Sequence, residues 1–252
     1  MSKLYDALQS AQKDQLAKFN DQDHGQPNSD PSPSKGKHVL STPQFNEESE
    51  LLALAQNIAA RLPNPDQNVI QFIGSQAGEG TSTLIREFAL VVAAKSNKPV
   101  LLVEADFKNP SQNQAFGIEA KPPLDFVLKE GKALDGVISQ VEQSNLFLAT
   151  LSSHFFRSLT ERSSFHSSDM WRVARNKFSL ILIDSSPVND SSDGLAICES
   201  VNGVILVLAA EKTRSVVAQN VKKQILKREG NLLGIVYTKR KFHIPQNIYK
   251  FL

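Results

Sequence analysis

Short apolar runs alternate along the chain with longer segments in which apolar residues recur at helical spacing. The runs are continuously apolar, which is typical of strands that are buried on both faces of a parallel sheet. We therefore predict an α/β fold of three layers, with a mainly parallel sheet covered by helices on both faces. The predicted strands span residues 68–73, 99–104, 145–151, 179–184, 203–209 and 232–237.

The pattern starts well inside the chain, and the segment before it has a different character. Leu4, Leu8 and Ala11 recur at helical spacing, so residues 1–18 predict a short amphipathic helix that either docks on another surface or frays. Residues 19–43 are rich in Asp, Asn, Ser and Pro, and they predict a disordered linker.

One globular domain is predicted over residues 44–240, followed by a tail over 241–252. The domain opens with a predicted helix over 47–61. Within it, residues 123–141 show a weaker helical pattern, and residues 154–168 favour a long loop or a short helix.

Composition narrows the class of protein. A chain of 252 residues that is 40% hydrophobic can bury one sizeable core, and its net charge of +2 is too small to indicate nucleic-acid binding. The single cysteine, Cys198, excludes an intramolecular disulfide and is expected in the core, as in a reducing cytoplasm. No run of about 20 apolar residues is present, so we expect a soluble protein that meets a membrane only through a partner.

The first strand runs into a glycine turn and then a helix over 84–95, which is the context of a phosphate-binding (Walker A) loop. Glycine lets backbone N–H groups converge on an anion, and the helix N-terminus adds positive potential. ATP or ADP is the expected ligand, and the Ser82 hydroxyl is expected to coordinate Mg²⁺. The predicted nucleotide-binding residues are Gly78, Glu79, Gly80, Thr81, Ser82 and Thr83.

Thr81 stands where such a loop carries its lysine. The lysine normally reaches the β- and γ-phosphates, and threonine is too short and uncharged to do so. A hydrogen bond to a charged group contributes roughly 1.5–3 kcal/mol. We therefore predict weakened nucleotide binding and severely weakened phosphoryl transfer.

Two more predicted strands end in a carboxylate, at Asp106 and at Asp184. Ligands of an open parallel sheet lie outside the carboxyl ends of its strands, so both side chains are expected near the loop. There they could hold Mg²⁺, and one could accept the proton of an attacking hydroxyl.

The order of these three motifs resembles the bacterial tyrosine kinases of capsule and exopolysaccharide export, which belong to the MinD- and ParA-like P-loop proteins. The resemblance covers roughly residues 45 to 240. It implies a P-loop kinase-like domain with Asp106 as the catalytic base, and Asp106, Asp184 and Ser82 at the metal. The motifs are Gly78-Glu79-Gly80-Thr81-Ser82-Thr83, Glu104-Ala105-Asp106-Phe107-Lys108-Asn109-Pro110 and Ile183-Asp184-Ser185-Ser186-Pro187.

The resemblance also implies partners and a location. The expected partner is the cytoplasmic segment of a membrane polysaccharide co-polymerase of the Wzz-like kind, which would hold the protein at the inner face of the plasma membrane. Self-association into a homo-oligomer is a further expectation. The phosphoacceptor would be Tyr249 in the C-terminal tail.

Four departures from the family pattern affect residues that the family uses for kinase activity. Thr81 replaces the lysine, and Glu104 stands where the second motif usually carries aspartate. The arginines that the family uses for ring-like assembly are missing from residues 48–58, and the tyrosine cluster of the tail is reduced to Tyr249. These departures favour a pseudokinase that serves as a regulator or adaptor.

Two alternatives remain open. The first is an active ATP-dependent tyrosine autokinase that controls polysaccharide chain length, with Lys108 standing in for the missing lysine. The second is a ParA-like positioning ATPase, which Thr81 disfavours, as does Gln76 at the place of that group's signature lysine.

Overall fold

The computed structural model describes residues 45–64, 66–128, 133–160 and 171–240. The predicted N-terminal helix (1–18), the linker (19–43) and the C-terminal tail with Tyr249 lie outside these residues.

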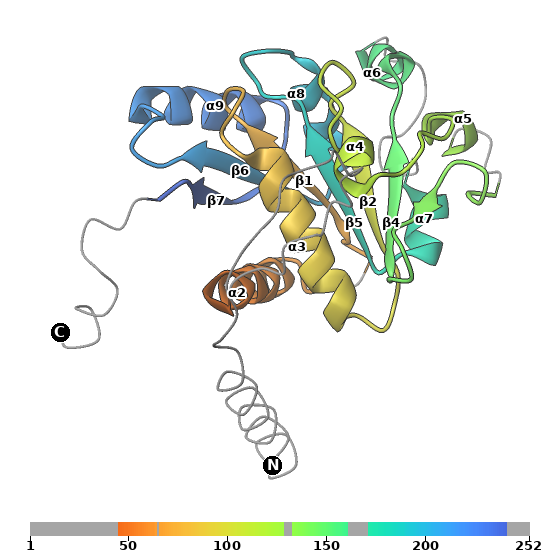
Figure 1. Cartoon of the computed structure of the whole chain (residues 1–252). Helices are drawn as coiled ribbons and strands as arrows, with labels where there is room; N and C mark the ends of the chain where they lie inside the picture. The colour runs from red at the N-terminus through yellow and green to blue at the C-terminus, as the bar shows by residue number, and fades with distance from the viewer. Residues whose placement is uncertain (1–44, 65, 129–132, 161–170, 241–252) are drawn as a thin grey trace, which may run out of the picture. The chain divides into compact units, whose positions relative to one another are not determined.

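The centre of the domain is a seven-stranded sheet with the order β3-β4-β2-β5-β1-β6-β7 (Figure 1). All neighbouring strands are parallel except the short pair β3 and β4, which is antiparallel. The predicted three-layer α/β fold is confirmed. The strands are β1 Val69–Gly74, β2 Val100–Ala105, β3 Ser139–Gln140, β4 Leu146–Thr150, β5 Leu180–Ser185, β6 Gly203–Ala209 and β7 Leu232–Thr238.

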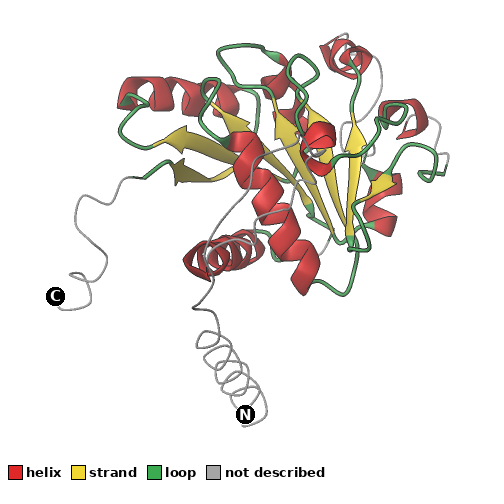
Figure 2. Cartoon of the chain, viewed as in Figure 1, coloured by secondary structure: helices red, strands yellow, loops and turns green. Residues whose placement is uncertain are grey.

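Helices cover both faces of this sheet (Figure 2). Helices α2 and α3 pack on one face, and α6, α7, α8 and α9 contribute to the core on the other. No described helix has both the length and the apolar character needed to cross a bilayer. The helices are α2 Phe45–Arg61, α3 Thr81–Lys95, α4 Gln112–Phe116, α5 Asp125–Leu128, α6 Ser153–Thr160, α7 Arg172–Lys177, α8 Asp193–Ile197 and α9 Ser215–Lys227, with the 3₁₀ turn η1 at Cys198–Ser200.

Each buried strand sends side chains into two separate cores, as the continuous apolar runs predicted. In β1, Ile70 and Phe72 belong to the core under α2 and α3, whereas Val69 and Ile73 belong to the opposite core. That second core also contains Cys198, which is 1% exposed, and its burial raises the pKa of the thiol to about 12. The prediction of a core cysteine is therefore confirmed.

The six predicted strands are found within one residue of their expected ends. Of the described residues in 123–141, where a weak helical pattern was predicted, Asp125–Leu128 form the helical turn α5 and Ser139–Gln140 form the edge strand β3. Residues 129–132 are not described. Part of the stretch 154–168 is helix α6, which makes the short-helix alternative right for the described residues.

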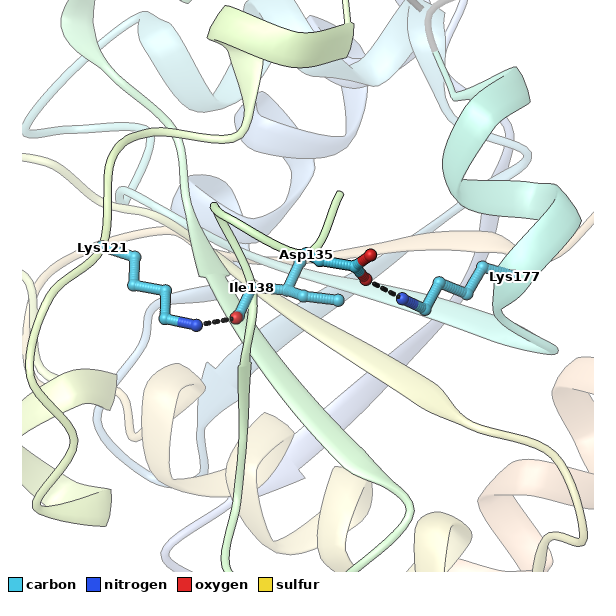
Figure 3. Close-up of polar contacts among 4 residues, drawn as sticks. All are labelled: Lys121, Asp135, Ile138 and Lys177. Atoms are coloured by element: carbon cyan, nitrogen blue, oxygen red, sulfur yellow. Dashed lines mark hydrogen bonds and ion pairs between the residues drawn. The ribbon is translucent and has the colours of Figure 1, made fainter. Parts of the chain in front are cut away.

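Two lysines contact the turn that precedes β3 (Figure 3). Lys121 Nζ donates to the carbonyl oxygen of Ile138 at 2.5 Å, and Lys177 Nζ lies 2.7 Å from Asp135 Oδ1. The hydrogen bond and the charge of Lys177 lower the pKa of the Asp135 carboxyl. Both contacts reach the hydrogen-bonded turn before β3, in which the Val137 and Ile138 amides donate to the Leu134 carbonyl oxygen.

Candidate phosphate-binding site

The loop between β1 and α3 has the backbone of a phosphate-binding loop. Gly78 and Gly80 adopt φ values of 78° and 87°, which residues with a Cβ rarely adopt. The helix's first hydrogen bond runs from the Leu84 amide to the Gly80 carbonyl at 2.9 Å. The amides of residues 81–83 precede that bond, so they remain free to bind an anion at the helix N-terminus.

Thr81 is the first residue of α3, and its side chain is turned back into the loop. The residue is 9% exposed. A Cβ placed on Gly74 would lie 2.7 Å from Thr81 Oγ1, so the hydroxyl sits directly over the end of β1. Position 81 therefore contributes a buried hydroxyl and no positive charge.

Glu79 braces the loop with its side chain. Its carboxylate is 1% exposed and accepts hydrogen bonds from the Ser75 amide at 2.6 Å, the Ser75 hydroxyl at 2.7 Å and the Gln76 amide at 3.1 Å. The Thr213 hydroxyl, from the turn after β6, donates to it at 2.5 Å. Since this side chain is occupied by the loop itself, only the backbone of Glu79 is available for phosphate.

The carboxyl end of β7 lies against the same loop. The Thr238 hydroxyl donates to the Glu79 carbonyl oxygen, and Lys239 Nζ donates to the Gly78 carbonyl oxygen at 2.5 Å. A lysine therefore contacts the loop, although it follows β7 and lies 161 residues beyond Gly78 in the chain.

The predicted carboxylates lie at the ends of β2 and β5, on the side of the loop where α3 begins. Asp184 is fully buried, and hydrogen bonds from the Gln112 and Ser82 side chains act on its carboxylate. Asp106 is 8% exposed and accepts hydrogen bonds from the Ser186 hydroxyl at 2.8 Å and the Asn109 amide at 3.2 Å.

Gln112 links these parts and was not foreseen from the sequence. Its Nε2 donates to Asp184 Oδ2 at 2.7 Å and to the Ser82 carbonyl oxygen at 3.0 Å, while its Oε1 accepts from Arg86 Nε at 3.0 Å. The side chain is fully buried. It thus joins the start of α3 to the end of β5, and no feature of its local sequence indicates this role.

Glu104 completes the acidic group. Its Oε2 accepts the amides of Ser111 and Gln112, both at 2.7 Å. Burial and then the charge of Asp184 raise the pKa of Glu104 to about 7, and burial raises the pKa of Asp184 to about 6. These shifts indicate carboxylates that need a proton or a cation to offset their burial.

Two oxygens in this group have no hydrogen-bond partner, Glu104 Oε1 and Asp184 Oδ1. Buried carboxylate oxygens are hard donors of the kind that Mg²⁺ prefers, and the Ser82 hydroxyl lies beside that of Asp184, so the residues present fit the ion. Within the described residues, no group of three or more His, Cys, Asp and Glu side chains is arranged to hold a metal by itself. Phosphate oxygens and water would have to complete the coordination.

Lys108 occupies a different place from the one expected of a stand-in lysine. Its Nζ donates to the Asp190 carbonyl oxygen at 3.2 Å, in the connection after β5. Of the two lysines, Lys239 rather than Lys108 has a hydrogen bond to the glycine loop.

The parallel sheet and the glycine loop define a P-loop α/β protein, the class that includes the ParA-like ATPases. A ParA family ATPase from Chlorobium tepidum superposes with a TM-score of 0.54 at 16% identity, covering 72% of this chain and 77% of that one. More narrowly, the chain is similar in sequence to bacterial tyrosine-protein kinases, as its three motifs predicted.

Relatives and solved structures both support this assignment. Tyrosine-protein kinase YwqD of Bacillus subtilis is 22% identical over 203 residues, which is 81% of this chain and 85% of that protein. Tyrosine-protein kinase ptk of Acinetobacter johnsonii is 28% identical over 159 residues, 59% of this chain but only 20% of that longer protein. No family model matches the chain.

Among solved structures, the VpsO kinase domain superposes with a TM-score of 0.62 at 25% identity, covering 79% of this chain and 100% of that domain. The chimerical protein CapA2B2 gives 0.67 at 19% identity, with 81% of this chain and 89% of that one covered. The second likeness concerns the fold alone.

Proposed function

We propose that this protein is a kinase-like regulator of exopolysaccharide or capsule biosynthesis that transfers phosphate poorly or not at all. It binds the cytoplasmic segment of a membrane polysaccharide co-polymerase, which holds it at the inner face of the plasma membrane. Nucleotide, bound at the loop with Mg²⁺, modulates this adaptor role.

The observation that carries the proposal is that the site has its glycine loop and carboxylates but has threonine in place of the loop lysine. The glycine loop follows β1, and the carboxylates Asp106 and Asp184 lie at the ends of β2 and β5, which is where a phosphoryl-transfer site of this fold would lie. Position 81, however, offers a buried hydroxyl where transition-state charge must be balanced by a cation. Binding tolerates such a loss better than catalysis does, because the loop amides still attract the phosphates.

An active tyrosine autokinase is the second candidate, and the acidic group favours it. Asp106 is oriented by Ser186 and lies in the motif of the family's catalytic base. When bound, Mg²⁺ would neutralise phosphate charge beside Asp184 and Ser82. Asp106 would then take the proton of the attacking hydroxyl, for which Tyr249 is the candidate.

A phosphotyrosine assay on the purified full chain with Mg²⁺-ATP separates the two candidates, with the VpsO kinase domain as a positive control. We expect at most a trace of the control signal. In cells lacking the protein, polymer length should be restored by the wild type and equally by Asp106→Ala. Strong autophosphorylation, together with loss of polymer control in Asp106→Ala, would establish the kinase instead.

A further inference from the structure

We propose that Lys239 supplies the positive charge of the phosphate loop, in the role that a lysine at position 81 would otherwise fill. The ligand is the polyphosphate of a nucleoside di- or triphosphate. This inference rests on the proposed function only in requiring that the loop binds nucleotide, and it holds whether or not phosphate is transferred.

The position of the ammonium group is the first support. Lys239 Nζ lies 2.5 Å from the Gly78 carbonyl oxygen, and its Cε would lie 3.9 Å from a Cβ built on Gly80. An ammonium group has three donors, so two remain for phosphate oxygens after the bond to Gly78. The charge thus stands beside the glycines whose backbone forms the anion site.

The backbone that carries this lysine is fixed on the loop. The Thr238 hydroxyl donates to the Glu79 carbonyl oxygen, and the Thr238 carbonyl accepts the Ala210 amide at 2.9 Å. Lys239 itself has a φ of 55°, an uncommon conformation for a residue with a side chain.

The acidic side of the site fits a bound Mg²⁺, and none of its residues supplies the positive charge that we assign to Lys239. The partnerless oxygens Glu104 Oε1 and Asp184 Oδ1 indicate a cation on the α3 side of the loop. Arg86, whose charge acts on Asp184, donates to Gln112, and Lys108 donates to the Asp190 carbonyl oxygen. Lys239 approaches from the β7 side, so it complements the metal and does not compete with it.

The test is calorimetry of ADP and of inorganic pyrophosphate with the full chain and Mg²⁺. Lys239→Met removes the charge at similar length, and Lys98→Met removes one charge at the opposite end of β2 as the matched control. We expect Lys239→Met to weaken both ligands roughly tenfold to a hundredfold, which is the size of one charge-assisted hydrogen bond. Lys98→Met should stay within about twofold of the wild type.

A reciprocal variant makes the assignment specific. If Lys239 serves as the loop lysine, Thr81→Lys should restore most of the affinity that Lys239→Met loses. The gain in affinity from Thr81→Lys should therefore be larger in the Lys239→Met background than in the wild type. Unfolding midpoints of all variants, measured without ligand, show whether the domain is intact. Lys239→Arg keeps the charge and should retain binding. It replaces Lys239→Met as the comparison if the methionine variant does not fold.

Three results would overturn the assignment: unchanged affinity in Lys239→Met, an equal loss in Lys98→Met, or no binding of either ligand by the wild type. None of them decides whether the protein is an adaptor, because that question is answered by the phosphotyrosine signal and by polymer length. Conversely, a strong phosphotyrosine signal would overturn the adaptor role. The role of Lys239 would still be decided by the ligand affinities of the variants.

Discussion

Glu104 and Asp184 occupy directly paired positions on the neighbouring strands β2 and β5, and each keeps one carboxylate oxygen without a hydrogen-bond partner. Both residues are almost completely buried. Parallel pairing places their side chains on the same face of the sheet, so their charges repel each other in a region with little water. This relationship makes the stability of the unliganded domain depend on pH.

Glu104→Gln is predicted to stabilise the unliganded domain at pH 8 and to change little at pH 5. The pKa of Glu104 is raised from 4.5 to about 7, so the protonated form stabilises the fold at low pH, and this stability is lost as the pH rises through 7. Glutamine stays neutral and can still accept the amides of Ser111 and Gln112. We expect a gain of about 1–3 kcal/mol at pH 8, measured by urea unfolding in EDTA.

Glu119→Gln is the matched control, because it removes an exposed carboxylate. It should leave the pH dependence of unfolding as it is in the wild type. A Glu104→Gln variant that is less stable than the wild type at pH 8 would contradict the buried repulsion inferred from the paired strands.

Gln112→Leu is predicted to destabilise the domain by about 2–4 kcal/mol. Leucine fills a similar volume but leaves Asp184 Oδ2 and the Ser82 carbonyl without their donor. Gln114→Leu, on the exposed side of the same helix, should change the free energy of unfolding by no more than about 0.5 kcal/mol. Equal effects of the two substitutions, measured by chemical unfolding, would show that the Gln112 bridge contributes nothing special.

The sequence predicted the sheet well because each inner strand is a continuous apolar run that fits between two layers of helices. It did not predict β3, which is only two residues long and has no pattern of its own. The site was predicted as far as its motifs extend, to the loop and the two aspartates. Gln112 and Lys239 were missed because their partners lie 72 and 161 residues away, and only the folded sheet brings those segments together.

Gly80→Ala is predicted to cost about 1–2 kcal/mol through backbone strain alone. Gly80 has a φ of 87°, but a Cβ there would meet nothing closer than Thr238 Oγ1 at 3.8 Å, which is an ordinary contact. Gly136→Ala has open space and no positive φ, so it should be close to neutral. If thermal unfolding gave the same midpoint for both variants, the left-handed turn would not be a requirement of the loop.

Thr81→Lys tests how much of the kinase site is left. The lysine side chain is too long for the space that the Thr81 hydroxyl fills beside Gly74, so it would extend along the loop toward the phosphates at the helix N-terminus. We predict that ATP binds more tightly in calorimetry, by less than the tenfold to hundredfold gain expected of the same change in the Lys239→Met background. Phosphotyrosine should rise little in the same sample, because Tyr249 is the only tyrosine of the tail.

The two readouts of Thr81→Lys separate binding from chemistry. Tighter ATP with a large phosphotyrosine signal would mean that Asp106 and Asp184 form a competent site that lacked only its lysine, and the idea of a broadly decayed enzyme would then fail. Tighter ATP without that signal would place the loss of activity beyond position 81. Glu104 is then the next position to change: Glu104→Asp in the Thr81→Lys background restores the family's usual carboxylate, and phosphorylation gained by that step would locate the second defect at the end of β2.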